Sequence, residues 1–171
     1  MNAVRFPRLL IVGLVALCIL VPGSAAFANP PSREPVPFES FTVSGACSFD
    51  FRIDVLSGSG EATTFYDQAG NVRLILFTGA ARQRYTNLST GQSMDYTNSS
   101  SARVVTDADG TTTVTITGPW GGDQTGGVVP GFPRAWTFHG RVVLTIDAAG
   151  NLVSITHTSG PVTDVCAALA G

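Results

Sequence analysis

Two histidines are the residues of this chain best suited to acid/base chemistry. The 171-residue sequence carries His139 and His157, and few other side chains titrate near neutral pH. If residues 147–150 form a turn, the flanking apolar runs pair with matching residues, and His157 lies opposite Gly140. His157 then points to the inner face, beside the space that a glycine leaves, whereas His139 points outward to solvent. We therefore predict that His157 is the polar group of an interior pocket.

Two aromatic side chains are predicted on the same inner face as His157. Trp136 and Phe138 alternate along the strand that precedes Gly140, so both would line an apolar interior. In such a pocket His157 would act as a general acid/base or as a polar anchor for a ligand. The alternative is an ordinary buried histidine, hydrogen-bonded to a hydroxyl such as that of Thr145 or to a backbone carbonyl.

The segment 118–135 is predicted to be a long loop. It is rich in glycine, proline and apolar residues and shows no strand pattern. Loops of this length in compact domains are usually lids, binding loops or disordered segments. Its large apolar residues need a surface to cover, and they are Trp120, Val128, Val129 and Phe132. We predict a flap over one mouth of the fold, with Trp120 and Phe132 as further ligand-binding candidates; a structural plug that completes the core is the alternative.

Other polar clusters do not predict a metal or cofactor site. Arg82, Arg84 and Tyr85 lie on one predicted strand and could contact a carboxylate or sulfate, but we expect a solvated strand face. Asp107 and Asp109 resemble the start of a calcium loop, yet the further aspartate and the distant glutamate of such a loop are missing. The two histidines point to opposite faces and cannot build a zinc site. We predict no metal and no cofactor.

Residues 1–28 have the pattern of an export signal. Arg5 and Arg8 precede an uninterrupted apolar run over 9–21, and residues 26–28 supply a small-x-small cleavage site. The run is shorter than the roughly 18–20 residues of a membrane-spanning helix, although an uncleaved anchor stays an alternative. We predict that the leader is cleaved, that the mature chain is secreted, and that it keeps no stable membrane anchor.

The mature chain is acidic and keeps two cysteines. Loss of Arg5 and Arg8 leaves eight of the ten basic residues, all arginine, against twelve acidic residues, so the formal charge is 8 − 12 = −4. Nucleic acids and anionic membranes need a basic face on their partner, so we expect neither. Outside the cytoplasm, Cys47 and Cys166 would form one disulfide that ties both ends of the fold together. Two buried free thiols are the alternative.

Period-two patterns predict an all-β fold. The proline-rich residues 29–45 predict an extended lead-in without ladder pairing, and 46–171 a single β domain. From Cys47 to Val55, apolar and polar residues alternate, and the pattern ends at a predicted turn over 57–60. Further strands, rich in β-branched and aromatic residues, are predicted near 62–66, 72–78, 81–88, 93–98, 102–106, 111–117, 136–146 and 152–158.

Three copies of one turn connect the predicted strands. Residues 67–70, 107–110 and 147–150 each begin with aspartate, which can cap the turn, and end with glycine, which takes the left-handed conformation. Their regular spacing predicts an antiparallel meander closed into a small barrel, with an open β-sandwich as the alternative. A short C-terminal helix is predicted over 162–169, held in place by Cys166.

The order of these features also resembles a known group of proteins. From about Ala46 to the end, the shared elements are a cysteine opening a Phe-rich strand, Thr86-Asn87 with Thr90-Gly91, Asp109-Gly110 before a Thr-rich strand, Gly118-Pro119-Trp120, Gly140-Arg141-Val142-Val143 and Asp164-Val165-Cys166. They are similar to small exported actinobacterial proteins of unknown function. The resemblance implies an exported β fold and no particular activity or site residue.

Together these patterns predict a secreted β-barrel protein that binds a small hydrophobic ligand in its interior. The inward His157, the aromatic face of Trp136 and Phe138, and the apolar loop over 118–135 lead to this expectation. Two other functions stay open. One is an extracellular structural or surface-interaction module, for which Thr-rich outer strands suffice. The other is a barrel enzyme that uses His157 as acid/base.

Overall fold

The computed structural model describes residues 29–125 and 128–171, so the predicted signal peptide over 1–28 lies outside the described residues. This part of the chain forms strands and one short helix. Their order is β1 (Ser32–Val36), β2 (Phe41–Val43), β3 (Phe51–Tyr66), β4 (Val72–Asn87), β5 (Ser93–Thr106), β6 (Thr112–Thr117), β7 (Trp120–Asp123), β8 (Ala135–Phe138), β9 (Arg141–Ile146), β10 (Leu152–Ser159), β11 (Val162–Asp164) and α1 (Val165–Leu169). The prediction of an almost entirely antiparallel β fold with a short C-terminal helix is confirmed.

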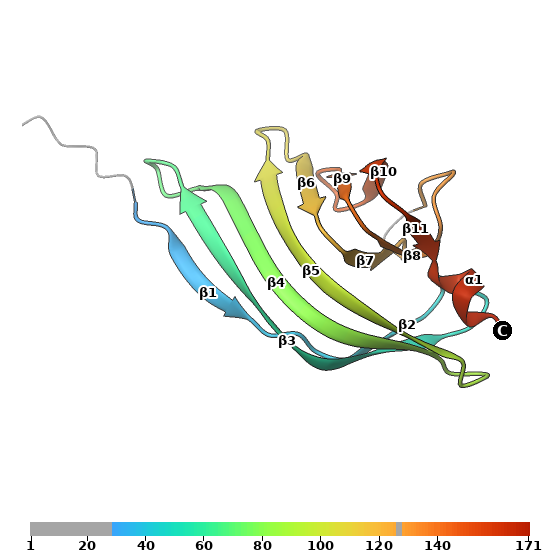
Figure 1. The fold of residues 1–171 in the computed structure, drawn as a ribbon. Helices are drawn as coiled ribbons and strands as arrows, with labels where there is room; N and C mark the ends of the chain where they lie inside the picture. The colour runs from blue at the N-terminus through green and yellow to red at the C-terminus, as the bar shows by residue number, and fades with distance from the viewer. Residues whose placement is uncertain (1–28, 126–127) are drawn as a thin grey trace, which may run out of the picture.

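The strands form two sheets that lie over one another. The larger has the order β1-β3-β4-β5-β6-β9-β10, with β2 pairing the opposite end of β3 from β1, and the smaller has the order β11-β8-β7. In Figure 1 the long strands β3, β4 and β5 sweep in a curve, and β7, β8, β11 and α1 lie on its concave side. Among the described strands neither sheet closes on itself, so the predicted barrel closure is not seen.

A row of three glycines explains why the large sheet stays open. The chain bends at Gly118 between β6 and β7, at Gly140 between β8 and β9, and at Gly160 between β10 and β11, with φ angles of 106°, 114° and 84°. These angles disfavour any residue with a Cβ. A Cβ at Gly140 would also lie 2.0 Å from the carbonyl oxygen of Ser159. We call the three glycines the glycine corner; the corner sends these strands over the concave face instead of around it.

The turn that was predicted over residues 57–60 does not form. Residues 57–60 lie inside β3, which pairs with β4 through Gly60 opposite Gly79. A glycine interrupts the side-chain alternation but not the backbone ladder, so the predicted strands at 72–78 and 81–88 are also one strand. The predicted strands at 93–98 and 102–106 are likewise one strand, which continues through three serines. A Cβ at either glycine would lie under 3.0 Å from the ring of Phe77, whose centroid lies 6.2 Å from that of Phe38. The glycines therefore make room for this aromatic pair.

The proline-rich lead-in takes part in the large sheet, so the prediction that it forms no ladder is wrong. β1 pairs antiparallel with β3, with Pro35 opposite Glu61, and β2 pairs with the first residues of β3. Proline is tolerated here because an edge strand has one side on which no backbone N–H is needed. The lead-in thus pairs with one edge of β3 at two places: β2 near its start and β1 near its end.

The three aspartate–glycine turns are confirmed. In residues 67–70, 107–110 and 147–150, the glycine N–H donates to the aspartate carbonyl at 3.1, 3.0 and 2.9 Å. The first aspartate of two turns also accepts side-chain and backbone hydrogen bonds from an asparagine four residues later. These local bonds fix the hairpins β3–β4, β5–β6 and β9–β10 without help from the rest of the fold.

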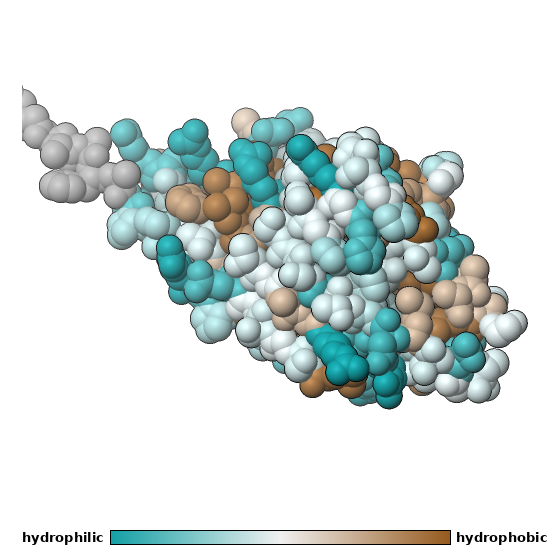
Figure 2. Space-filling model, viewed as in Figure 1, coloured by the Kyte–Doolittle hydropathy of each residue, from teal (hydrophilic) through white to brown (hydrophobic). Residues whose placement is uncertain are grey.

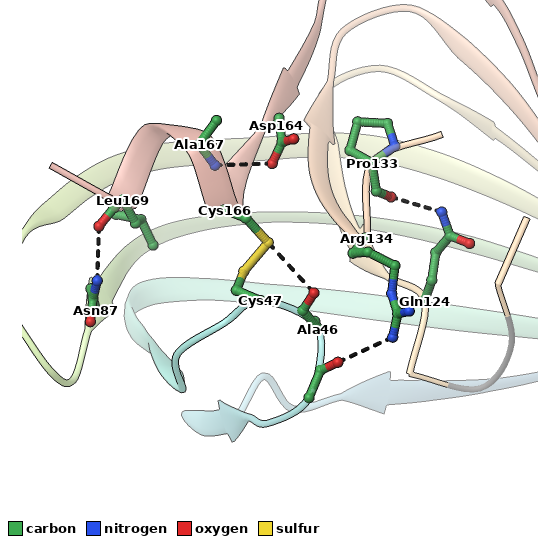
Figure 3. Close-up of a disulfide and its surroundings, with 11 residues drawn as sticks. Ala46, Cys47, Asn87, Gln124, Pro133, Arg134, Asp164, Cys166, Ala167 and Leu169 are labelled. Carbon is green, nitrogen blue, oxygen red and sulfur yellow. Dashed lines mark hydrogen bonds between the residues drawn. A yellow bond between two sulfur atoms is a disulfide. The ribbon is translucent and has the colours of Figure 1, made fainter. Parts of the chain in front are cut away.

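A disulfide joins the start of the β domain to its end, as predicted. Cys47 and Cys166 are bonded across 119 residues, with their Cα atoms 5.4 Å apart. In Figure 3 the bond connects α1 to the segment between β2 and β3. Asp164 caps α1, because its carboxylate accepts a hydrogen bond from the N–H of Ala167 at 3.1 Å.

Helix α1 is shorter than predicted and is packed against the concave face. Residues 162–164 form β11, which pairs with β8, and the helix starts only at Val165. Val165 and Leu169 are fully buried in a cluster with Phe51 of β3. At the helix end, the Asn87 side-chain amide donates to the carbonyl of Leu169 at 2.9 Å (Figure 3). Apolar packing, an amide contact and the disulfide therefore hold the C-terminus.

Candidate functional site

A cavity of about 540 Å³ lies between the concave face of the large sheet and β7–β8. This volume falls in the range of small-molecule sites, about 300–1,000 Å³. It is lined by Pro37, Phe38, Glu39, Phe41, Phe51, Ile53, Gln83, Tyr85, Asn98, Trp120, Gly121, Gly122, Asp123 and Trp136. The lining comes from both sheets: the lead-in, β2, β3, β4 and β5 contribute from the large sheet, and β7 and β8 from the small sheet.

Aromatic side chains form most of the cavity wall. Phe51 comes from the buried start of β3, Trp120 opens β7, and Trp136 of β8 is only 2% exposed. Phe41 stands at the mouth and is 48% exposed. The wall contains both tryptophans of the chain, so a molecule entering the cavity would contact the two residues that dominate the intrinsic fluorescence.

Three uncharged polar side chains form the floor, and we call them the polar trio: Gln83, Tyr85 and Asn98. All three are buried. The Gln83 side-chain oxygen accepts from the Tyr85 hydroxyl at 3.3 Å and from the Asn98 amide at 2.8 Å. Among the described residues, Asn98 Oδ1 is buried with no hydrogen-bond partner. An unpartnered buried acceptor costs about 1–3 kcal/mol, so the trio is incomplete as it stands.

The charges around the cavity are negative. Glu39 and Asp123 line it, and none of the described lining residues is basic. Burial raises the pKa of the Tyr85 hydroxyl, and the charges of Tyr96 and Asp123 raise it further. Tyr85 therefore stays protonated at physiological pH and serves as a neutral hydrogen-bond group.

The segment 118–135 covers the concave face, but not as the strandless loop that was predicted. Its first part is β7, of which Trp120 through Asp123 line the cavity. After β7, the buried Gln124 side chain donates to the carbonyls of Phe132 and Pro133 at 3.0 and 2.8 Å. A strand and a hydrogen-bonded loop thus form the cover.

Of the five predicted ligand-binding residues, two line the cavity and three do not. Trp120 and Trp136 line the cavity, whereas Phe132, Phe138 and His157 are not among its lining residues. Phe132 packs edge-on against Trp136 with ring centroids 5.6 Å apart, and Phe138 does so at 6.3 Å. The His157 ring lies beyond Phe138, at 6.0 Å. Two of the five candidate residues thus line the cavity, and the histidine lies behind Phe138.

His157 occupies a different register from the predicted one. It pairs with Val142 instead of Gly140, for two reasons: Leu152, and not Asn151, lies opposite Ile146, and a bulge between Leu152 and Ser154 shifts β10 by one more residue along β9. Gly140 lies instead in the glycine corner. His157 Nε2 is buried without a hydrogen-bond partner among the described residues, so the expected hydroxyl or carbonyl contact does not form at this atom. This places the imidazole in the apolar packing behind the cavity.

The arginines of β4 point away from the cavity. Arg84 donates to the two carboxylate oxygens of Asp95 at 2.7 and 3.1 Å, and Arg82 approaches the same carboxylate at 3.5 Å. This solvated ion-pair cluster agrees with the expected strand face. Tyr85 belongs to the opposite face with Gln83, and alternation along β4 was the signal that could have separated it from the arginines.

The polar trio was not recognised in the sequence as a site. Gln83 and Asn98 break the rule that inward positions are apolar, and in the sequence they are indistinguishable from surface residues. Their alternation with exposed neighbours, and with the buried Tyr85, was the only signal.

Two further searches limit the chemistry of the described residues. Across 29–125 and 128–171, no three histidine, cysteine or acidic side chains gather as a metal site. Within the same residues, no helix has the length and apolar character needed to cross a bilayer. Comparisons of the chain with protein-family models, curated proteins and solved structures give no match, so the cavity itself must carry the functional inference.

Proposed function

We propose that the chain is exported and binds a small, mainly apolar molecule in the cavity between its two layers. One observation carries this proposal: a cavity of about 540 Å³ with aromatic walls and a neutral polar floor. Ligand sites commonly combine apolar walls with a few convergent polar groups that orient the ligand.

Export is supported by two independent features. The N-terminal sequence has a basic start, an apolar run and a small-residue cleavage site. The Cys47–Cys166 disulfide belongs to an oxidising compartment, because cytoplasmic reductants keep most thiols reduced. Export also explains why a cavity protein would need its two ends covalently joined.

The surface supports the cavity as the place of binding. On the face shown in Figure 2, hydrophobic residues are scattered among pale and hydrophilic ones and do not merge into one patch. Protein-interaction sites usually present a large contiguous apolar patch. The face in Figure 2 shows no such patch, and the cavity is the feature with apolar walls and convergent polar groups.

Binding without turnover fits the groups at the cavity better than acid/base catalysis at His157. The imidazole is not among the lining residues and lies behind Phe138. Burial keeps the Tyr85 hydroxyl protonated by raising its pKa. A general base must lie within hydrogen-bond reach of the proton that it removes, and His157 does not meet this requirement for a molecule in the cavity.

Intrinsic tryptophan fluorescence tests the proposal, because both tryptophans line the cavity. Purified protein is titrated with octan-1-ol, octanamide and octanoate, and at least one should change the emission saturably. The half-exposed Phe41 is then replaced by serine. Covering half a phenylalanine contributes about 1 kcal/mol, so Phe41→Ser should weaken binding about fivefold.

The matched control is Leu88→Ser. Leu88 is 53% exposed, like Phe41, but is not among the cavity-lining residues. It should leave the affinity unchanged. Absence of saturable binding for all three probes, or an equal loss in both variants, would refute binding in the cavity.

A further inference from the structure

We infer that the cavity selects a neutral molecule with a hydroxyl or amide head group and rejects the corresponding carboxylate. This inference rests on the proposed function and adds the chemical class of the ligand. It follows from the charge at the cavity and from the hydrogen-bonding capacity of the polar trio.

The charge argument comes from which residues face the cavity. Glu39 and Asp123 are lining residues, and no arginine accompanies them among the described lining residues. The nearby arginines of β4 are engaged with Asp95 on the outer face. A carboxylate that entered would give up its hydration, meet two like charges and find no counter-ion. A neutral head group also gives up hydration, but at a much lower cost, and it meets no repulsion between like charges.

The hydrogen-bond argument comes from the floor. Each side-chain amide has two N–H donors and one acceptor oxygen. Asn98 donates one N–H to Gln83, while its own Oδ1 has no partner among the described residues. Oδ1 is shielded in the structure, and because the last torsion of asparagine is soft, rotation of the amide would be the movement that turns Oδ1 toward a ligand. A ligand that can donate a hydrogen bond completes the trio.

Only some head groups match this floor. A hydroxyl or a primary amide can donate to Asn98 Oδ1 and also accept from an amide N–H of Gln83 or Asn98. An ionised carboxylate only accepts, so it could bind the unpartnered Nε1–H of Trp136 but would leave Oδ1 without a partner. The aromatic wall of Phe51, Trp120 and Trp136 would hold the apolar body of the ligand.

The test compares three probes that share one alkyl chain: octan-1-ol, octanamide and octanoate. Binding is followed at neutral pH, where octanoate is ionised, by tryptophan fluorescence and confirmed by calorimetry. The two neutral probes should bind at least about tenfold more tightly than octanoate, a difference of 1.4 kcal/mol. If octanoate binds as tightly as octan-1-ol, the selectivity is refuted while cavity binding stands. If none of the three binds, the proposed function fails and this inference with it.

A pair of double variants isolates the charge contribution. Glu39→Gln/Asp123→Asn removes both carboxylates at the cavity, and should tighten octanoate binding about fivefold without changing the affinity for octan-1-ol. The control, Glu34→Gln/Asp50→Asn, removes the same total charge from exposed residues outside the lining and should change neither affinity. An equal effect of the two double variants would show that overall charge, and not the cavity, governs selection.

A single variant isolates the floor. Asn98→Leu keeps a similar volume and removes the unpartnered acceptor. It should weaken octan-1-ol and octanamide binding about fivefold and leave octanoate unchanged. Circular dichroism and the urea midpoint show whether the variant is folded. If a folded Asn98→Leu protein binds octan-1-ol as tightly as the parent, the polar trio does not determine which head group is bound.

Discussion

Replacement of Gly140 by alanine tests whether the glycine corner holds the second layer in place. Gly140 has a φ of 114°, and an added Cβ would lie 2.0 Å from the carbonyl oxygen of Ser159 and 2.7 Å from its carbonyl carbon. Both are backbone atoms, so no side-chain rotation can relieve the overlap. The end of β10 has to move away from β9, and Ser159 opposite Arg141 is the pair that separates first.

Gly150 provides the matched comparison. It also has a positive φ, 86°, but no atom lies within 4 Å of its added Cβ. Gly150→Ala should therefore cost only the left-handed conformation, about 1–2 kcal/mol. Gly140→Ala has this cost and also loses about two backbone hydrogen bonds near the corner, each contributing about 1 kcal/mol. The expected loss of unfolding free energy is thus about 3–4 kcal/mol.

Urea denaturation measures both losses, with tryptophan fluorescence as the probe. Because β7 and β8 cover the cavity, Gly140→Ala should also weaken octan-1-ol binding, whereas Gly150→Ala should not. Equal unfolding free energies for the two variants, within about 0.5 kcal/mol, would refute the steric argument at the corner. Normal ligand binding in a strongly destabilised Gly140→Ala protein would refute the link between the corner and the cavity.

Two further predictions concern buried groups. Burial raises the pKa of Tyr85 above 10.0, so above about pH 10 the unfolded chain loses a proton that the folded chain keeps, and stability should fall as pH rises. In urea unfolding at about pH 8 and about pH 11, Tyr85→Phe should shrink this fall, and an unchanged fall would contradict the assignment. The second variant, His157→Leu, removes a buried nitrogen without a described partner and should raise the unfolding free energy by up to about 1 kcal/mol. A loss of more than about 1 kcal/mol would show instead that this imidazole makes a stabilising hydrogen bond.

Local features were the ones that sequence patterns predicted well. The three aspartate–glycine turns depend on bonds within five residues, so their positions could be recognised without the fold. The disulfide also followed from composition, since the chain after residue 28 has only Cys47 and Cys166. Features that depend on how two strands pair were harder to predict from the sequence. The pairing of Asn151 with Asp147 at the turn and the bulge in β10 each moved His157 by one position on β9, and no local pattern marks such a bulge.

Glycine was the other source of error. In β3 it was taken to end a strand, although Gly60 and Gly79 continue the ladder and leave space for aromatic rings. At the glycine corner its bends were not foreseen, so residues 136–146 were predicted as one strand and the sheet as closed. At the cavity, Trp120 was predicted because large apolar residues in a loop need a surface to cover, and Trp136 because strand alternation placed it on the inner face. Gln83 and Asn98 were not, because their inward position depends on register.

The position of the disulfide has a consequence for how the protein folds. Most of the large sheet pairs strands that follow one another along the chain, so its hairpins can form early and locally. Cys47 and Cys166, in contrast, are separated by 119 residues and are brought together only when α1 packs beside the start of β3. Oxidation of the two thiols should therefore come last, and free thiols in a newly folding chain would mark molecules in which β7, β8, β11 and α1 have not yet packed on the large sheet.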